Sequence, residues 1–249
     1  MTFPSSIVNP HYTGTLHQPR TKQAVYARLP DAPINGSPVP HLTSLYHNSD
    51  KDAYGDRRYP GNCGGMLIRD LITYFAPRNV LDPMTGSGTC ADVCKELSLP
   101  CTSLDIRYGF DATNPACYDK QLNGAKFDFI WAHPPYWRQK LYTVNSRDLS
   151  RTDSLPEFLE GYASFIKCCA DSLQPNGKFA ILMGDYNDRS GFIPLVHYTK
   201  ELAFKAGLRQ HCTDIIRFSH GASSSRKVYR SSFIPGLHDV CMIFEKVPQ

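Results

Sequence analysis

The sequence predicts an α/β fold, in which a mostly parallel β-sheet carries helices on both faces. Along residues 58–249, short strand-like segments alternate with helix-like segments. A glycine-rich turn, Gly86-Ser87-Gly88, connects one of these strands directly to a helix. The last two strand-like segments are separated by a loop alone, which predicts an antiparallel pair at one edge of the sheet.

Each element is expected from its apolar spacing. The first helix is expected within residues 63–77, where Met66, Leu67, Leu71 and Tyr74 are spaced for one helical face and a proline follows. The remaining elements follow from the same patterns: strands at 79–83, 100–106, 127–133, 178–185, 209–219 and 238–246, and helices at 89–99, 156–177 and 191–207. Pro175 and Gly177 are expected to end the long helix over 156–177.

The N-terminal residues 1–57 differ in character from the rest of the chain. They are rich in Pro, His, Tyr and Asn and show no long periodicity, which predicts a loop-rich arm with one short helix. A partly disordered leader fits the same composition. A second domain is expected over residues 58–249, with its most mobile segment in the polar loop 219–236.

Composition limits the class of protein. The 249 residues are 41% hydrophobic, which allows a sizeable core. No apolar run reaches the ~18 residues of a membrane span, and no secretory signal is evident at the start. The nine cysteines form no C-x-x-C pair, so a zinc site is not expected, and reduced core cysteines fit a cytoplasmic protein. The net charge of +4 permits a polyanionic partner without requiring one.

The glycine-rich turn lies within "LDPMTGSGT", residues 81–89. Such a turn brings the backbone close to a ligand and directs free N–H groups into the crevice at the end of the strand. The glycine spacing fits neither the G-x-G-x-x-G of a dinucleotide site nor a phosphate-binding P-loop. Asp82 at the mouth would repel a phosphate and instead suits a cation such as an α-amino group.

Two further acids follow at informative positions. Asp105 ends the second strand, where a carboxylate in doubly wound folds binds ribose hydroxyls, and Asp111 is placed to meet an adenine amino group. Amine, ribose and adenine together describe S-adenosylmethionine. Taken one at a time, Asp82 and Asp105 are equally explained as turn or capping residues.

Together, "DPMTGSGT" and "HPPYW" (residues 133–137) resemble the cofactor loop and catalytic corner of the S-adenosylmethionine-dependent amino-methyltransferases, which methylate the exocyclic amino group of adenine or cytosine, mostly in DNA. The resemblance covers about residues 58–249. It implies a Rossmann-like class I methyltransferase fold, with a seven-stranded, mostly parallel sheet and an antiparallel final strand, although the apolar pattern alone gives six strands. It also implies that S-adenosylmethionine is bound by the loop and the acids after it: Asp82, Pro83, Thr85, Gly86, Ser87, Gly88, Thr89, Asp105, Ile106 and Asp111.

The corner "HPPY" is expected to be catalytic, through His133, Pro134, Pro135 and Tyr136. An exocyclic amine is a poor nucleophile, because its lone pair is delocalised into the ring. Two prolines fix the backbone and remove N–H donors, which leaves the Pro134 carbonyl to accept an amine hydrogen. Tyr136 supplies a flat face for a base that has left the duplex.

One residue departs from the family pattern. The first position of the corner is usually Asp, Asn or Ser, and here it is His133. A neutral imidazole accepts a hydrogen bond through one ring nitrogen, whereas imidazolium cannot. Alternatively, His133 packs or caps locally, and Pro134 is then the only acceptor. The departure leaves the choice between adenine and cytosine open.

Nucleic acid is expected to contact the residues around this corner. Trp137 either extends the stacking surface or packs in the core, which is the commoner position of an aromatic beside a strand. Basic side chains suit phosphate contacts, although each one alone is equally explained as a solvated surface residue. The candidates are Arg138, Lys140, Arg147, Arg151, Arg226, Lys227 and Arg230.

The leading prediction is therefore a DNA amino-methyltransferase that acts as a monomer or homodimer. Two alternatives stay open: an amino-methyltransferase for RNA, and a degenerate methyltransferase fold that binds nucleic acid or a partner without catalysis. Only the N-terminal arm and the loop 219–236 are left for substrate recognition, which suits a short site, a dimer or a structured RNA.

Overall fold

The structure, a computed structural model, describes residues 31, 33–47, 53–188, 191–218, 234 and 236–248. The chain divides into two compact units, Met1–Pro33 and Ile34–Gln249, and everything described below belongs to the second. Within the described residues, no helix is both long and apolar enough to cross a lipid bilayer.

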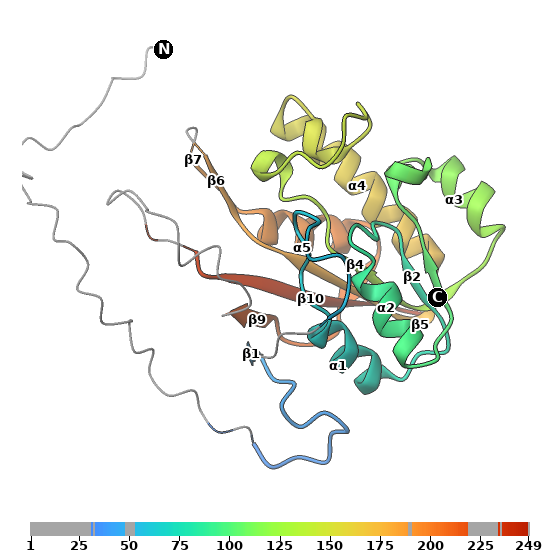
Figure 1. Ribbon diagram of the computed structural model, residues 1–249, viewed down its shortest axis with the longest axis vertical. Helices are drawn as coiled ribbons and strands as arrows, with labels where there is room; N and C mark the ends of the chain where they lie inside the picture. The colour runs from blue at the N-terminus through green and yellow to red at the C-terminus, as the bar shows by residue number, and fades with distance from the viewer. Residues whose placement is uncertain are drawn as a thin grey trace, which may run out of the picture. The chain divides into compact units, whose positions relative to one another are not determined.

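A single eight-stranded sheet forms the centre of this unit (Figure 1). Its neighbours follow the order β1-β9-β10-β5-β4-β2-β3, and β8 pairs with β10. Every pair is parallel except those made by β10, which runs antiparallel to β5, β8 and β9. The strands are β1 (Leu45–His47), β2 (Val80–Asp82), β3 (Cys101–Ser103), β4 (Phe127–Ala132), β5 (Leu173–Met183), β8 (Leu208–Gln210), β9 (Ile215–Phe218) and β10 (His238–Lys246).

Helices cover both faces of the sheet, as expected. On one face α1 (Met66–Phe75) and α2 (Thr89–Glu96) pack with Phe129 and Trp131 of β4. On the other face lie α3 (Pro115–Leu122), α4 (Leu155–Ser172) and α5 (Leu195–Lys205), packed around residues such as Ile130 and Phe179. Residues 129–132 of β4 and 179–183 of β5 form continuous buried apolar runs, which is typical of a doubly covered parallel sheet.

The Rossmann-like α/β architecture and the antiparallel final strand confirm the predicted fold class. The sheet has eight strands where seven were expected, and two of its features were not anticipated. The region expected as one strand over 209–219 forms two strands, β8 and β9, which lie along the same side of β10. The strand β1 comes from the arm over residues 1–57, where the described residues contain no helix.

Three local expectations were wrong. The long helix α4 ends at Ser172 and passes directly into β5, because a residue before a proline, here Gln174, disfavours helical geometry and the chain becomes extended from Leu173. Residues 191–193 form β7 of a small hairpin with β6 (Tyr186–Asp188) instead of the start of a helix. Helix α3 was missed, although its signal is present: Asn114 caps the Ala116 N–H and Pro115 follows the cap.

Candidate active site

A cavity opens at the carboxyl ends of β2, β3 and β4, where doubly wound folds bind ligands. It encloses about 820 Å³ of space, a volume that includes the open solvent at its mouth. Each residue predicted to bind the cofactor lines this cavity except Gly88. The lining residues from that prediction are Asp82, Pro83, Thr85, Gly86, Ser87, Thr89, Asp105, Ile106 and Asp111.

The glycine-rich turn owes its shape to two positive φ angles. Gly86 has φ +50° and Gly88, the N-cap residue directly before α2, has φ +86°. Glycine adopts these angles without the steric cost that a side chain brings. A Cβ atom on Gly86 would also lie 3.1 Å from the Tyr59 ring, so this position favours glycine for space as well. The first turn of α2 thus reaches the cavity wall, where Thr89 and Cys90 line it.

Asp82 forms the buried floor of the cavity at the end of β2. Its side chain is 2% exposed and accepts a hydrogen bond from the Met84 N–H at 3.2 Å. Burial, followed by the nearby Cys101, raises the pKa of the Asp82 carboxyl well above its ordinary value. A positively charged ligand in the cavity would stabilise the ionised form of this carboxyl.

Asp105 is held in place by its neighbours on the next strand end. It accepts hydrogen bonds from the Gly86 N–H at 2.9 Å and from the Arg107 N–H and Nε at 2.9 and 2.8 Å. Arg107 also donates to the Gly86 carbonyl and lies 4.6 Å from the centre of the Tyr59 ring. The carboxylate is therefore oriented at the cavity wall, with Arg107 beside it.

Asp111 faces the cavity from the segment that precedes α3. It is 5% exposed and accepts hydrogen bonds from the Thr113 N–H and hydroxyl at 2.9 and 2.7 Å. Arg147 lies 3.7 Å from its other oxygen and also lines the cavity. Arg147 was predicted to contact nucleic acid, and the structure places its guanidinium beside Asp111 at the cavity.

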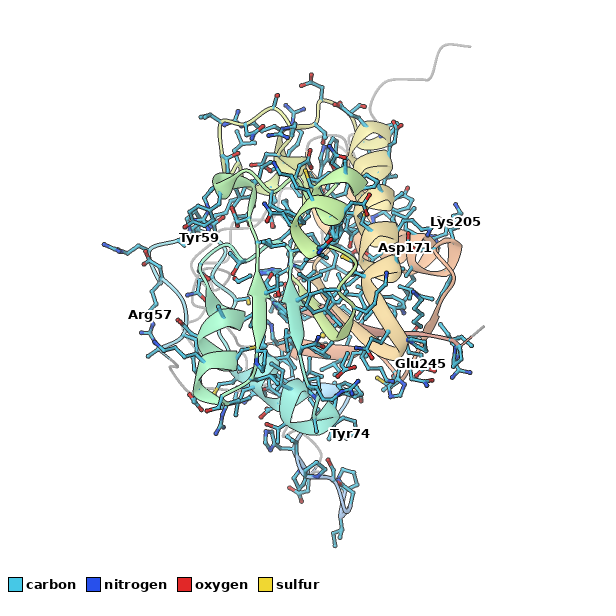
Figure 2. The ribbon with its side chains drawn as sticks, turned by 90° about the vertical axis from the view of Figure 1, so that its right-hand side faces the viewer. Arg57, Tyr59, Tyr74, Asp171, Lys205 and Glu245 are labelled. Atoms are coloured by element: carbon cyan, nitrogen blue, oxygen red, sulfur yellow. The ribbon has the colours of Figure 1, made fainter. Side chains whose placement is uncertain are left out.

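Two loops form the outer wall of the cavity. The sequence did not identify their tyrosines, Tyr59 and Tyr142, as residues of the site. Tyr59 and Tyr142 stack with ring centres 6.0 Å apart, and both line the cavity (Figure 2 labels Tyr59). The loop that carries Tyr59 is tied to the glycine-rich turn by the Asp56 N–H, which donates to the Ser87 carbonyl at 2.9 Å. The only sequence signal was the tyrosine content of these segments, which is not specific.

A buried acid organises the second of these loops. Asp148 is 4% exposed and accepts hydrogen bonds from the Thr143 N–H and hydroxyl, both at 2.9 Å, and from the Ser150 N–H at 2.9 Å. The loop therefore wraps around this carboxylate, which fixes Tyr142 and Thr143 at the cavity wall.

The "HPPY" corner follows β4 and meets the same cavity. His133 and Pro135 line it, whereas Pro134 is buried and Tyr136, which packs against Gly184, is not among the lining residues. The Tyr136 hydroxyl is 3.0 Å from His133 Nε2, and the two rings meet edge to face. Burial, followed by the neighbouring Asp239, raises the pKa of Tyr136 well above its ordinary value, so the phenol stays neutral.

Trp137 does not offer a stacking surface, which corrects the prediction that it contacts nucleic acid. It is 7% exposed and packs in the hydrophobic core, with its indole edge-on to Tyr186 at 5.8 Å and its N–H directed to the Thr152 carbonyl at 3.4 Å. Of the two roles expected for Trp137, the structure therefore shows packing in the core. Arg138 and Lys140 are exposed beyond the corner, and Arg226, Lys227 and Arg230 lie outside the described residues.

Comparison with known proteins gives structural neighbours of low similarity. TrmN from Thermus thermophilus is 17% identical with a TM-score of 0.38, over 68% of this chain and 44% of that protein. A "Putative DNA Modification Methylase" from Thermus thermophilus, complexed with S-adenosyl-L-methionine, is 17% identical with a TM-score of 0.36, over 51% of this chain and 47% of that protein. A SAM-dependent methyltransferase from Archaeoglobus fulgidus is 15% identical with a TM-score of 0.44, over 72% and 93%.

The chain therefore spans less than half the length of the first two of these proteins, 44% and 47%. No protein-family profile matches the chain, and no curated protein matches its sequence. Similarity this low assigns neither a substrate nor a reaction, so the function has to be inferred from the chain's own residues.

Proposed function

We propose that this protein is an S-adenosylmethionine-dependent methyltransferase that methylates the exocyclic amino group of adenine or cytosine in DNA. The observation that carries the proposal is the meeting of two sets of residues around one cavity. Asp82, Asp105 and Asp111 lie along its wall in chain order, and the corner that contains His133 and Pro135 borders the same space.

The cavity residues fit this cofactor in their chemistry. Asp82 suits the cationic α-amino group, Asp105 the two hydroxyls of the ribose and Asp111 the amino group of adenine. Each of these carboxylates is at most 5% exposed, so a contact with any of them would be shielded from solvent. The bound cofactor would supply an electrophilic methyl group carried on a sulfonium.

The corner provides for the amine that accepts this methyl. Pro134 and Pro135 carry no N–H that could compete for the Pro134 carbonyl. A neutral His133 would be the second acceptor after exchanging its 3.0 Å contact with the Tyr136 hydroxyl for the amine. Holding both amine hydrogens directs the nitrogen lone pair towards the methyl group and keeps the base in position for attack. Tyr136, directly after the prolines, would support the base by stacking, provided that its ring turns from Gly184 towards the cavity.

The test is methyl transfer with isotope-labelled S-adenosylmethionine, using unmethylated duplex DNA and, separately, total RNA. Products are digested to nucleosides and identified by mass. Label in N6-methyldeoxyadenosine or N4-methyldeoxycytidine from the DNA is the expected result, with loss of transfer in Tyr136→Ala. Label that appears only in RNA nucleosides would show that the substrate is RNA instead of DNA. Cofactor binding without transfer to either nucleic acid would indicate a binding protein without this activity.

A further inference from the structure

Three cysteines meet behind the cavity wall. Cys90 and Cys94 lie four residues apart on one face of α2, and Cys101 begins the neighbouring strand β3. Their sulfur atoms all lie within 4.8 Å of one another, and Cys90 and Cys94 are 1% and 0% exposed. It is the one group of three or more such ligand side chains found in the part of the chain that the structure describes.

This spacing is close to that of thiolates that share a metal ion. With metal–sulfur bonds of about 2.3 Å, sulfurs in a tetrahedral or trigonal site lie roughly 3.8–4.0 Å apart. The three sulfurs, each within 4.8 Å of the others, are therefore at most about 1 Å further apart than in such a site, and metal binding would draw them together by no more than that. We propose that Cys90, Cys94 and Cys101 bind a single thiophilic d¹⁰ metal ion, of the class of Zn²⁺, Cd²⁺ or Cu⁺.

The chemistry of the donor set selects this class of ion. Three sulfur ligands without an oxygen favour soft cations over Mg²⁺ or Ca²⁺, which prefer oxygen ligands. Each thiol that coordinates the metal releases its proton to solvent.

The cluster of Cys90, Cys94 and Cys101 lies next to the cavity. Cys90 is itself a lining residue, so the metal site and the cavity share one wall. Binding of the metal does not depend on the proposed methyl transfer, and its test needs neither cofactor nor nucleic acid.

The experiment titrates the full-length, fully reduced chain with Cd²⁺ under anaerobic conditions, after removal of metals by a chelator. We expect one tight site per chain, detected by sulfur-to-metal charge-transfer absorption, and X-ray absorption at one equivalent should count three sulfur neighbours. Cys90→Ala, Cys94→Ala and Cys101→Ala should each weaken binding at least tenfold. Cys168→Ala, which removes a buried thiol of α4 outside the cluster, should leave the affinity unchanged.

Thermal unfolding of each metal-free variant shows whether it still folds, and the X-ray absorption measurement uses the unaltered chain in any case. Equal weakening in Cys168→Ala and in the cluster variants would overturn the proposal, because binding would then be a general property of the thiols. Absence of a one-equivalent site in the unaltered chain, or fewer than three sulfur neighbours, would overturn it as well.

Discussion

Asp82 shows how a single residue trades stability against ligand binding. Its carboxyl is 2% exposed, and burial raises its pKa well above the ordinary value of 3.8. A carboxyl whose pKa is raised by folding contributes least to stability once pH exceeds its folded pKa, because the unfolded chain ionises it freely. Asp82 therefore opposes folding at neutral pH while it provides the charge that a cationic ligand needs.

We predict that Asp82→Asn stabilises the ligand-free protein at pH 7, by about 1 kcal/mol, and weakens S-adenosylmethionine binding at least tenfold. The gain in free energy of unfolding should shrink as pH falls towards 4, where the wild-type carboxyl becomes protonated in the unfolded state as well. Urea unfolding at several pH values, together with calorimetric titration, measures both effects. A variant that is less stable than wild type at pH 7 would show that the carboxylate is already compensated.

The proposed role of His133 as acceptor predicts that methyl transfer depends on pH. Only a neutral imidazole accepts a hydrogen bond, and an unperturbed histidine becomes protonated at about pH 6.5. We expect the rate of methyl transfer to fall on the acid side of neutrality in wild type. His133→Asn keeps an acceptor that does not titrate, so its profile should lose the acid limb. A wild-type rate that is flat from about pH 5.5 to 8.5 would exclude His133 as the acceptor.

At the scale of the elements, an ion-pair cluster ties together three strands at the end of the sheet opposite the cavity. Glu245 of β10 contacts Arg209 of β8, His211 at 2.8 Å and Lys178 of β5 at 3.3 Å (Figure 2 labels Glu245). Hydrogen bonding from Arg209 is the largest of the effects that lower the pKa of Glu245 to about 2. This contact set spans the parallel strand β5, its antiparallel neighbour and the short strand beyond.

We predict that Glu245→Gln lowers the free energy of unfolding by roughly 1–3 kcal/mol at pH 7, since it removes charge-assisted hydrogen bonds from a 7% exposed group. A carboxyl with a lowered pKa stabilises the fold above its unfolded value of 4.5 and loses that effect as pH falls towards about 2. The difference between variant and wild type should therefore vanish at acid pH. Glu201→Gln, which removes an exposed pair with Lys205 on α5, serves as control and should change stability by less than about 0.5 kcal/mol.

For the whole molecule, the sequence predicts the architecture well, but it predicts only some of the residues that line the site. Alternating apolar segments and the "DPMTGSGT" turn predict the sheet and place Asp82, Asp105 and Asp111 together, because the carboxyl ends of parallel strands meet at one edge. The Tyr59–Tyr142 pair and the Asp148-centred loop escape prediction, since the pair joins segments far apart in the chain that have no periodic pattern. The same holds for β1, a three-residue strand whose pairing with β9 is set by tertiary contacts.

The two outer loops lead to a prediction about the ligand-bound molecule. Tyr59 and Tyr142 come from segments far apart in the sequence, yet they stack on each other and line the same space. A ligand between them and the strand ends contacts both loops, so it should slow backbone hydrogen exchange over residues 53–63 and 141–149 together. Exchange over β8, remote from the cavity lining, should not change.

Hydrogen exchange followed by mass spectrometry, with and without S-adenosylhomocysteine as a non-reactive ligand, measures this directly. Tyr142→Ala removes one half of the stack and should reduce the protection of the 53–63 segment as well as its own. Residues 53–63 and 141–149 are far apart in the sequence. Protection of both segments together therefore requires that they contact each other or the same ligand at the cavity. Protection confined to one loop in the unaltered chain would mean that the ligand does not bridge them, and that the cavity closes from one side only.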